Sequence, residues 1–430
     1  MNTIVKHLQS HKGVCAYKIN LRRKESYELF FVKGNLETVR NTDNTDKEVT
    51  VYVDHGEFRG HSQFFVYPST TEDELQKLVA EAVEKAKLID NPFYELVPNE
   101  KLPFVSDDQT VPTNFDQWDA ADLAAEIANT VFDANTLDVT SLNAVEIFIN
   151  RITETVVNSR GLHRKQVRWT GMVEAIPTAT EQGESVELYE QYTFNAMKPE
   201  NITYEIGEKL RQAKARLEAQ RLEVTGNPRV ILGAQELSEL FWNFAYDLNF
   251  ATVYSHQNVF SKGDAIQSDP KGDRIGLSVE SLLPRCAGSR MFDSDGMLLS
   301  NARLIIDNGR VAAYHGSNRF AQYLNEKPTG SMPCICLTGG TATKSQLTTG
   351  PYLEVLSMSG IQTDFYSDYV GGEIRLAYWH DGTQIRPVTG ISISGKLSEV
   401  LNHIRFSKEL TVCGNYGGPK KAIIEGMNIF

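Results

Sequence analysis

The chain has 430 residues, of which 41% are hydrophobic and 10% aromatic, and its formal net charge is −12 at pH 7. This length and apolar content suffice for two or three packed domains. The acidic balance argues against electrostatic binding to nucleic acid. No apolar run approaches the roughly 18 to 20 residues of a membrane helix, and the start MNTIVKHLQSHKGV lacks the apolar region of a signal peptide. With five cysteines, too few for a disulfide framework, we expect a cytoplasmic protein with reduced thiols.

Residues 26–66 predict an antiparallel meander of four strands in two hairpins. The first hairpin turns at Lys33-Gly34-Asn35 and the second at His55-Gly56, where glycine supplies a positive φ. The basic cluster Arg22, Arg23 and Lys24 indicates a solvated turn. After the meander, Thr71 and Glu74 form a capping-box pattern that begins a helix, which ends before Asp90-Asn91-Pro92.

A similar order of elements follows in residues 115–221. Residues 115–132 predict a helix whose apolar face carries Trp118, Leu123, Ile127 and Val131. Strand-like runs cover 142–149, 152–158, 166–176 and 185–194, and ITYEIGEKLRQAKARLEAQRL then predicts another helix. The sequence therefore predicts an α+β domain over 1–226, a strand meander with helices and a possible internal duplication.

The pattern of predicted elements changes near Gly226-Asn227-Pro228, where we place the domain boundary. One helix is expected in ELSELFWNFAYDLNF, and another short one at 397–404. Most of the rest consists of short β runs, with hairpin turns at Asn308-Gly309 and Asp381-Gly382. Residues 227–430 are therefore predicted to form a β-rich domain.

The stretch LTVCGNYGGP places Cys413 where the backbone bends sharply and can approach a ligand closely. Four other groups of residues carry patterns typical of binding sites, and each is better explained by ordinary structure. A predicted hairpin tip contains Asp54, His55, Glu57 and His61, and no second Cys or His pair lies at zinc-site spacing from Cys334 and Cys336. The second glycine of a phosphate loop is missing from GGTATKS at 339–345, and the last ligand of a calcium loop is missing after Asp293-Ser294-Asp295-Gly296.

Several runs, in order and over nearly the full chain, resemble the TldD/PmbA family, long labelled modulators of DNA gyrase and understood as subunits of a cytoplasmic zinc-dependent peptidase. They are ELFFVKGNLETVRNTDNTDKEVTVYVDHGEFRGHS before TEDEL, SRGLH, RVILGAQELSELF, FSKGDAI, LIIDNGRVAAYHGSNRFAQYL and PVTGISISGKLSEVLNHI leading into LTVCGNYG. The catalytic type in this family builds a metal site from an HExxxH motif and a cysteine near the C-terminus. Cys413 stands where that cysteine would stand.

The resemblance places Trp242 and Asn243 at the His-Glu pair of the motif and Asp247 at its second histidine. No histidine lies between His163 and His256, so no shift of the comparison restores the motif. One thiolate and one carboxylate do not complete a zinc site. The resemblance therefore implies a PmbA/TldE-like subunit with no catalytic residue, metal ligand or cofactor, in which Cys413 is a relic or a small apolar side chain on a turn.

Such a subunit is expected to bind a TldD-like catalytic partner, or itself as a homodimer, through the domain that begins near Pro228. Its task would be to help enclose a flexible, extended peptide, with no role for nucleic acid or membrane. Two alternatives remain: a stand-alone peptidase that uses a different site, and a regulator of gyrase or DNA, as the old family label implies.

Overall fold

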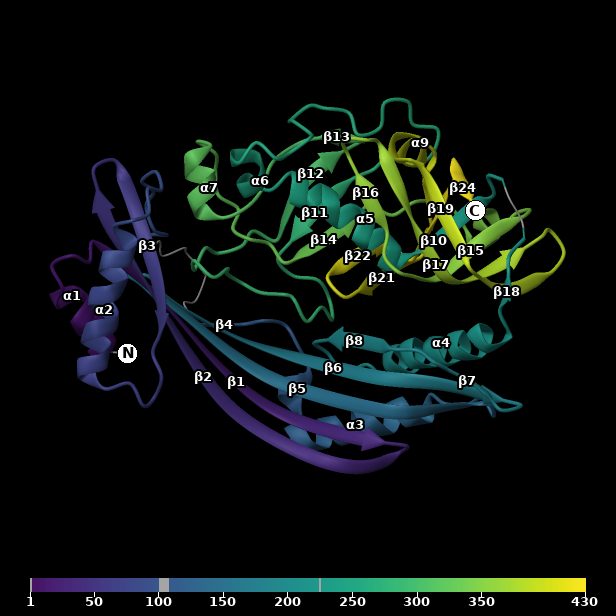
Figure 1. Ribbon diagram of the computed structural model, residues 1–430, viewed down its shortest axis with the longest axis horizontal. Helices are drawn as coiled ribbons and strands as arrows, with labels where there is room; N and C mark the ends of the chain where they lie inside the picture. Colours follow the sequence, from purple (N-terminus) through teal and green to yellow (C-terminus); the bar gives the residue numbers. More distant parts are fainter. Residues whose placement is uncertain (1, 100–107, 224–225) are drawn as a thin grey trace.

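The computed structural model describes residues 2–99, 108–223 and 226–430. The protein has an α+β architecture in which a long curved sheet from the first half of the chain passes under a β-rich second half (Figure 1). The elements of the first half are α1 (Asn2–Ser10), β1 (Ala16–Val32), β2 (Asn35–His55), β3 (Phe58–Phe65), α2 (Glu72–Ala86), β4 (Asp108–Thr110), the 3₁₀ turn η1 (Phe115–Gln117), α3 (Ala120–Asp133), β5 (Thr140–Asn158), β6 (His163–Glu181), β7 (Glu184–Glu187), β8 (Glu190–Phe194), α4 (Pro199–Glu218) and β9 (Gln220–Arg221).

The curved sheet has the strand order β3-β2-β1-β5-β6-β4, with β7 and β8 also paired to β6. Both predicted turns of the meander are present, but β2 runs unbroken between them, so the meander has three strands and not four. The expected strands at 142–149 and 152–158 are likewise a single strand, β5. The two strand groups that suggested a duplication meet in this one sheet, where β1 pairs with β5.

The prediction of a turn at Arg22–Lys24 is wrong, because these residues lie in the middle of β1. Carboxylates next to this basic segment neutralise it: Arg23 donates to both oxygens of Asp43 on β2, at 2.9 and 2.7 Å. Paired charges are compatible with a solvated strand face. A charge run alone therefore could not distinguish a turn from a long, exposed strand.

Helices cover two separate stretches of the curved sheet. The capping box at α2 is confirmed, with Thr71 and Glu74 bonding each other's backbone N–H groups, and α1 and α2 pack against the start of β1 and the end of β2. Farther along the sheet, α3 and α4 share a second core with β1, β5 and β6. Trp118 was expected on the buried face of α3, but it precedes that helix and is 39% exposed.

The second half of the chain builds two sheets around one core. One has the order β20-β23-β10-β15-β17-β18-β9, with β16 and β19 on β17 and β24 on β19; the other has the order β13-β12-β11-β14-β22-β21. The elements are β10 (Arg229–Gly233), α5 (Ala234–Asp247), α6 (Phe250–Tyr254), β11 (Leu277–Glu280), β12 (Ala302–Asp307), β13 (Arg310–Val311), α7 (Asn318–Tyr323), β14 (Cys334–Leu337), α8 (Lys344–Leu347), β15 (Tyr352–Met358), β16 (Gln362–Asp364), β17 (Tyr369–His380), β18 (Ile385–Thr389), β19 (Ile391–Lys396), α9 (Leu397–His403), β20 (Arg405–Phe406), β21 (Leu410–Cys413), β22 (Tyr416–Pro419), β23 (Lys421–Ile424) and β24 (Met427–Ile429).

Helix α5 lies at the centre of this core and contacts strands of both sheets. Its fully buried side chains are Leu237, Leu240, Phe241, Phe244 and Ala245. These residues recur at spacings of three and four, so one face of α5 packs into the core, while Gln235 and Tyr246 on other faces are exposed. The helix predicted in residues 236–250 is present as α5, which begins and ends slightly earlier. The predicted helix at 397–404 and the predicted turns at Asn308-Gly309 and Asp381-Gly382 are also present.

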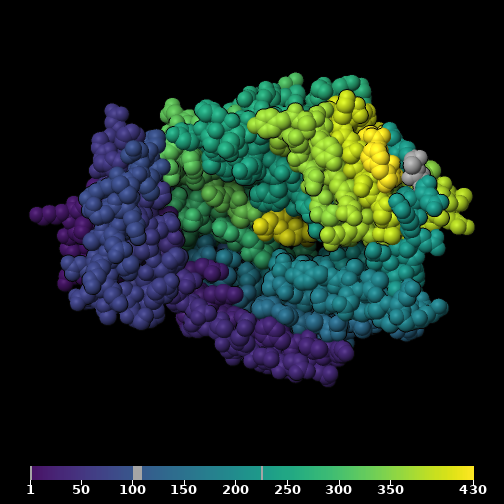
Figure 2. All heavy atoms as spheres, viewed as in Figure 1, coloured from purple at the N-terminus to yellow at the C-terminus, as the bar shows by residue number. Residues whose placement is uncertain are grey.

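The two halves meet along α4, which packs on the curved sheet and also on β17 and β18. The strand β9 precedes the expected domain boundary, yet it pairs in parallel with β18 of the second half. Figure 2 shows the first half of the chain against one end and the underside of the second half. Within the described ranges, every helix is too short or too polar to span a lipid bilayer.

Candidate functional site

Cys413 is the last residue of β21, at the hairpin that joins β21 to β22. The chain reverses through Gly414, which has a φ of 54°, so that Tyr416 pairs with Cys413. This left-handed backbone explains the glycine, and the sharp bend expected after Cys413 is confirmed. In Figure 1 the hairpin faces β8 and α4 of the first half.

The Cys413 thiol lies among carboxylates from three elements. Burial, which is the largest cause, acts together with the charges of Glu205, Glu190 and Glu236 to raise its pKa to about 12, while Lys209 acts in the opposite direction. A thiol with such a pKa is protonated and neutral at pH 7, so it is a poor nucleophile. We call Glu190, Glu205, Lys209, Glu236 and Cys413 the junction cluster.

The carboxylates of the junction cluster differ in how they are satisfied. Glu190 on β8 forms an ion pair with Lys209 on α4, with 2.9 Å between Nζ and Oε2. Burial, together with the Glu190 charge, raises the pKa of Glu205 to about 7. Glu236 is 6% exposed, and its Oε2 accepts the Gly233 N–H at 3.2 Å at the start of α5. The cluster therefore holds a carboxyl group that exchanges its proton near neutral pH.

The three residues expected at the metal-binding motif all lie on α5. Trp242 is partly buried against the core, and the Asn243 side-chain amide donates to the Glu239 carbonyl at 2.8 Å. Asp247 is buried, and its oxygens accept the backbone N–H groups of Val259 and Phe260 at 2.7 and 3.1 Å. Burial raises the pKa of Asp247 in spite of these bonds. Asp247 thus fastens the loop after α6 to the end of α5.

These residues do not fit the zinc ion that the fold family implies. An indole offers no ligand atom, both Asp247 oxygens are occupied by N–H donors, and the one nearby thiol is surrounded by carboxylates and not by imidazoles. Zinc sites in enzymes use three such ligands and keep a fourth position open. Among the residues described, no three His, Cys, Asp or Glu side chains are grouped so as to hold a metal ion.

Sequence reasoning missed His315, the histidine that contacts α5. Its Nε2–H donates to the Ala245 carbonyl at 2.7 Å, while its Nδ1 is buried without a partner in the described structure. Burial lowers the pKa of His315 to about 4, so the ring is neutral and connects the end of α5 to the segment before α7. The sequence also gave no signal for Glu190 and Glu236, whereas Glu205 and Lys209 show only the common spacing of four residues on a helix.

The other candidate sites have ordinary structural partners. Around the β2–β3 turn, Asp54 pairs with Arg59, His55 lies 3.7 Å from Asp90, and His61 bonds to Asn91. In the segment 339–345, Thr343 caps the short helix α8. Glu57 lies in the predicted β2–β3 turn, whereas Asp54 and His55 end β2 and His61 lies on β3, so the sequence interpretation placed the turn correctly but made it too long.

Cys334 and Cys336 lie on strand β14, as expected, but the nearest thiol to Cys334 is one the sequence did not indicate. The Sγ atoms of Cys334 and Cys286 are 3.3 Å apart in the core. Asp293 forms the predicted turn, in which its Oδ1 accepts the N–H groups of Asp295 and Met297. That carboxylate is therefore engaged by the backbone.

Fold and family comparisons agree on one class of protein. The whole chain is similar to TldE from Thermococcus kodakarensis, with a TM-score of 0.80 and 13% identity over 100% of this chain and 99% of that chain. It is also similar to candidate modulators of DNA gyrase from Bacteroides thetaiotaomicron (TM-score 0.78, 15% identity, 100% and 96% covered) and Thermotoga maritima (0.77, 15%, 100% and 100%). No curated protein matches the chain closely enough to count as a relative.

The architecture is thus the α+β fold shared by TldE and those proteins. Residues 225–430 match the family model of the PmbA/TldA metallopeptidase C-terminal domain. Residues 225–430 therefore carry the C-terminal domain of this metallopeptidase family, and the whole chain has the fold of TldE.

Proposed function

We propose that this chain is a PmbA/TldE-like subunit, without catalytic residues of its own, of a cytoplasmic zinc peptidase complex of the TldD/TldE type. In this proposal it associates with a TldD-like catalytic subunit and helps to enclose flexible peptides or unfolded segments. The position of the domain boundary near Gly226–Pro228 and the association through the second domain are parts of the same proposal.

The observation that carries the proposal is the state of α5. The helix that would present the metal ligands instead presents Trp242 to the core and commits Asp247 to two backbone N–H groups. These contacts stabilise the fold and leave neither side chain available to bind a metal ion. The protonated thiol of Cys413 among carboxylates supports the same conclusion, since a zinc-bound cysteine must be a thiolate.

The edge of a sheet beside the junction cluster supports the peptide part of the proposal. β21 is the terminal strand of its sheet, and Leu410 at its start is 62% exposed. A strand edge offers backbone donors and acceptors to an extended peptide without any reactive side chain. In this proposal, the chain holds the extended peptide and its partner subunit hydrolyses it.

Reconstitution tests the proposal. The chain is expressed alone and together with the TldD-like protein of the same organism, and hydrolysis of an unstructured peptide is followed with and without a chelator. We expect a stable complex by size-exclusion chromatography with light scattering, and chelator-sensitive cleavage only when the TldD-like subunit is present. A partner variant without its motif histidines should lose activity, whereas Cys413→Ala in this chain should keep it.

The alternatives predict different results. A stand-alone peptidase would cleave the peptide without the partner, and a regulator of gyrase would change supercoiling by purified gyrase when this chain alone is added. Either result, or failure of the two chains to associate at micromolar concentration, would contradict the proposal. A chain that forms only homodimers and leaves the partner's activity unchanged would contradict it equally.

A further inference from the structure

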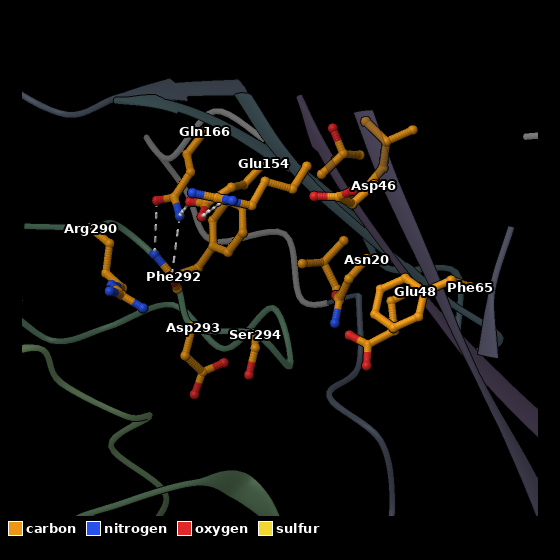
Figure 3. A pocket seen from close by; sticks show the side chains of 14 residues that line it. Asn20, Asp46, Glu48, Phe65, Glu154, Gln166, Arg290, Phe292, Asp293 and Ser294 are labelled. Atoms are coloured by element: carbon orange, nitrogen blue, oxygen red, sulfur yellow. Dashed lines mark hydrogen bonds and ion pairs between the residues drawn. The ribbon is translucent and has the colours of Figure 1, made fainter. Parts of the chain in front are cut away.

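A cavity of about 270 Å³ lies between the curved sheet and residues 290–294 of the second half (Figure 3). Its volume is close to the lower end of the range for small-molecule pockets, roughly 300 to 1,000 Å³. A single small molecule is thus the ligand that the space can enclose. The walls come from both halves of the chain, and neither the junction cluster nor α5 contributes to them.

The register of the sheet explains which side chains form one wall. Two neighbouring cross-strand rows face the cavity, because directly paired residues share a face of a sheet. The first row is Phe65, Glu48, Asn20 and Val156, and the second is Asp46, Arg22, Glu154 and Gln166. The opposite wall is formed by Arg290, Phe292, Asp293 and Ser294.

Some charged groups of the cavity are already satisfied within the protein. Glu154 accepts bonds from Arg168 at 3.1 and 3.2 Å and from Gln166 at 2.8 Å. Asp293 is buried and accepts three backbone N–H groups, including that of Ser331 at 3.0 Å. These two carboxylates have little capacity left for a ligand.

Other groups have unused capacity, and they are divided by sign except for Arg22, which lies on the same wall as Asp46 with its Nε 4.0 Å from Glu154. The Asn20 Oδ1 is buried without a hydrogen-bond partner, and in the described structure the Asp46 and Glu48 carboxylates have no ion pair or hydrogen bond. Across the cavity, Arg290 donates from Nε to the Gly288 carbonyl at 3.3 Å, while its two terminal nitrogens have no partner among the described residues. Figure 3 places Arg290 on one side and Asp46 and Glu48 on the other.

We propose that this cavity binds a zwitterion about the size of a dipeptide. Its ammonium group lies against Asn20 and Glu48, with Asp46 nearby, and its carboxylate accepts two parallel bonds from Arg290. Guanidinium and carboxylate match in this bidentate geometry. A plain anion such as phosphate would face Asp46 and Glu48, and a plain cation would face Arg290. The choice of a peptide as ligand rests on the proposed function, because short zwitterions are what a peptidase complex releases.

Titration calorimetry on the isolated full chain tests this site with four probes: alanyl-leucine, its N-acetyl form, its C-terminal amide, and the doubly blocked compound. We expect the free dipeptide to bind and each blocked end to weaken binding about ten- to a hundredfold, as loss of a charge-assisted contact does. The variants are Glu48→Gln and Arg290→Gln. Glu37→Gln on the same strand and Arg386→Gln, both at exposed positions, are matched controls.

The decisive result is a crossover between variants and probes. Glu48→Gln should weaken binding of the free dipeptide and remove the difference in affinity between the free and the N-acetylated probes. Arg290→Gln should weaken the same binding and remove the difference between the free and the amidated probes. The control variants should bind all probes as the parent does. If Arg290→Gln fails to fold, Arg290→Lys keeps the charge without the two parallel bonds and should lose part of the affinity.

Two results overturn the proposal: no binding of the free dipeptide at millimolar concentration, or equal binding of free and doubly blocked probes. The measurement needs no partner subunit. A failure of the peptidase reconstitution therefore leaves this test intact, and a failure here leaves the reconstitution intact.

Discussion

Glu205→Gln should stabilise the protein at alkaline pH and have little effect at acidic pH. Glu205 lies on α4 at the contact between the two halves, where burial and the Glu190 charge raise its pKa from 4.5 to about 7. The ionised form is therefore penalised in the folded state. Glutamine keeps the shape of the side chain and cannot acquire that charge.

The magnitude follows from the shift. Each pKa unit corresponds to about 1.36 kcal/mol, so the ionised Glu205 lowers the free energy of unfolding by roughly 3 kcal/mol above pH 8. Because the folded pKa is the higher one, the contribution of Glu205 is fully favourable below pH 4.5 and is lost as pH rises through about 7. The other groups that act on Glu205 are Lys209, Lys420 and Glu208, and the two lysines reduce the penalty.

Urea denaturation of parent and variant at pH 5 and pH 8 provides the measurement. We expect the difference between variant and parent in unfolding free energy to grow by about 2 to 3 kcal/mol in favour of the variant from pH 5 to pH 8. Glu218→Gln is the matched control, because Glu218 lies at the end of the same helix with its side chain 47% exposed. A difference that is the same at both pH values would refute the assignment of a neutral-pH proton to Glu205.

Three further predictions concern α5 and the thiols. Asp247→Ala should lower the unfolding free energy by about 2 to 4 kcal/mol in urea titrations, because two backbone N–H groups lose a buried acceptor; a change below 0.5 kcal/mol would contradict the fastening role. Elemental analysis of protein purified without added metal should find far less than one zinc per chain, and Cys413→Ala should not change that value. Iodoacetamide should modify exposed Cys15 in the native protein, and reach the buried Cys286 and Cys334 only after unfolding, as peptide mass spectrometry would show.

Local signals in the sequence predicted local structure well. The capping box at Thr71 and the glycine turns at Gly34, Gly56 and Gly309 were correct, since each is determined by residues close to it in the chain. The helical pattern of residues 236–250 also predicted α5, although the helix begins and ends slightly earlier. Its place between two sheets was not predictable, because that depends on strands far away in sequence.

The lengths of the strands and the junction cluster could not be predicted either, because they also depend on residues that are far apart in the sequence. β2 continues through a polar stretch because β1 supplies cross-strand partners such as Arg23. The junction cluster combines residues of β8, α4, α5 and β21, and no spacing within one element reveals it. The resemblance identified Cys413 and the missing histidines, but not the carboxylates that raise the pKa of the Cys413 thiol.

The second half of the chain needs the strand β9, which lies outside the family match at 225–430, to complete one of its sheets. Gln220 and Arg221 lie outside that match, yet they close one end of the ten-stranded sheet by pairing with Val388 and Thr389 of β18. During synthesis β9 leaves the ribosome long before β18, and it stays unpaired until that late strand arrives. A protein cut at the family boundary would expose β18 as a bare edge, where unrelated strands can add. The smallest fragment of this chain that can complete its own sheet therefore begins upstream of the matched C-terminal domain.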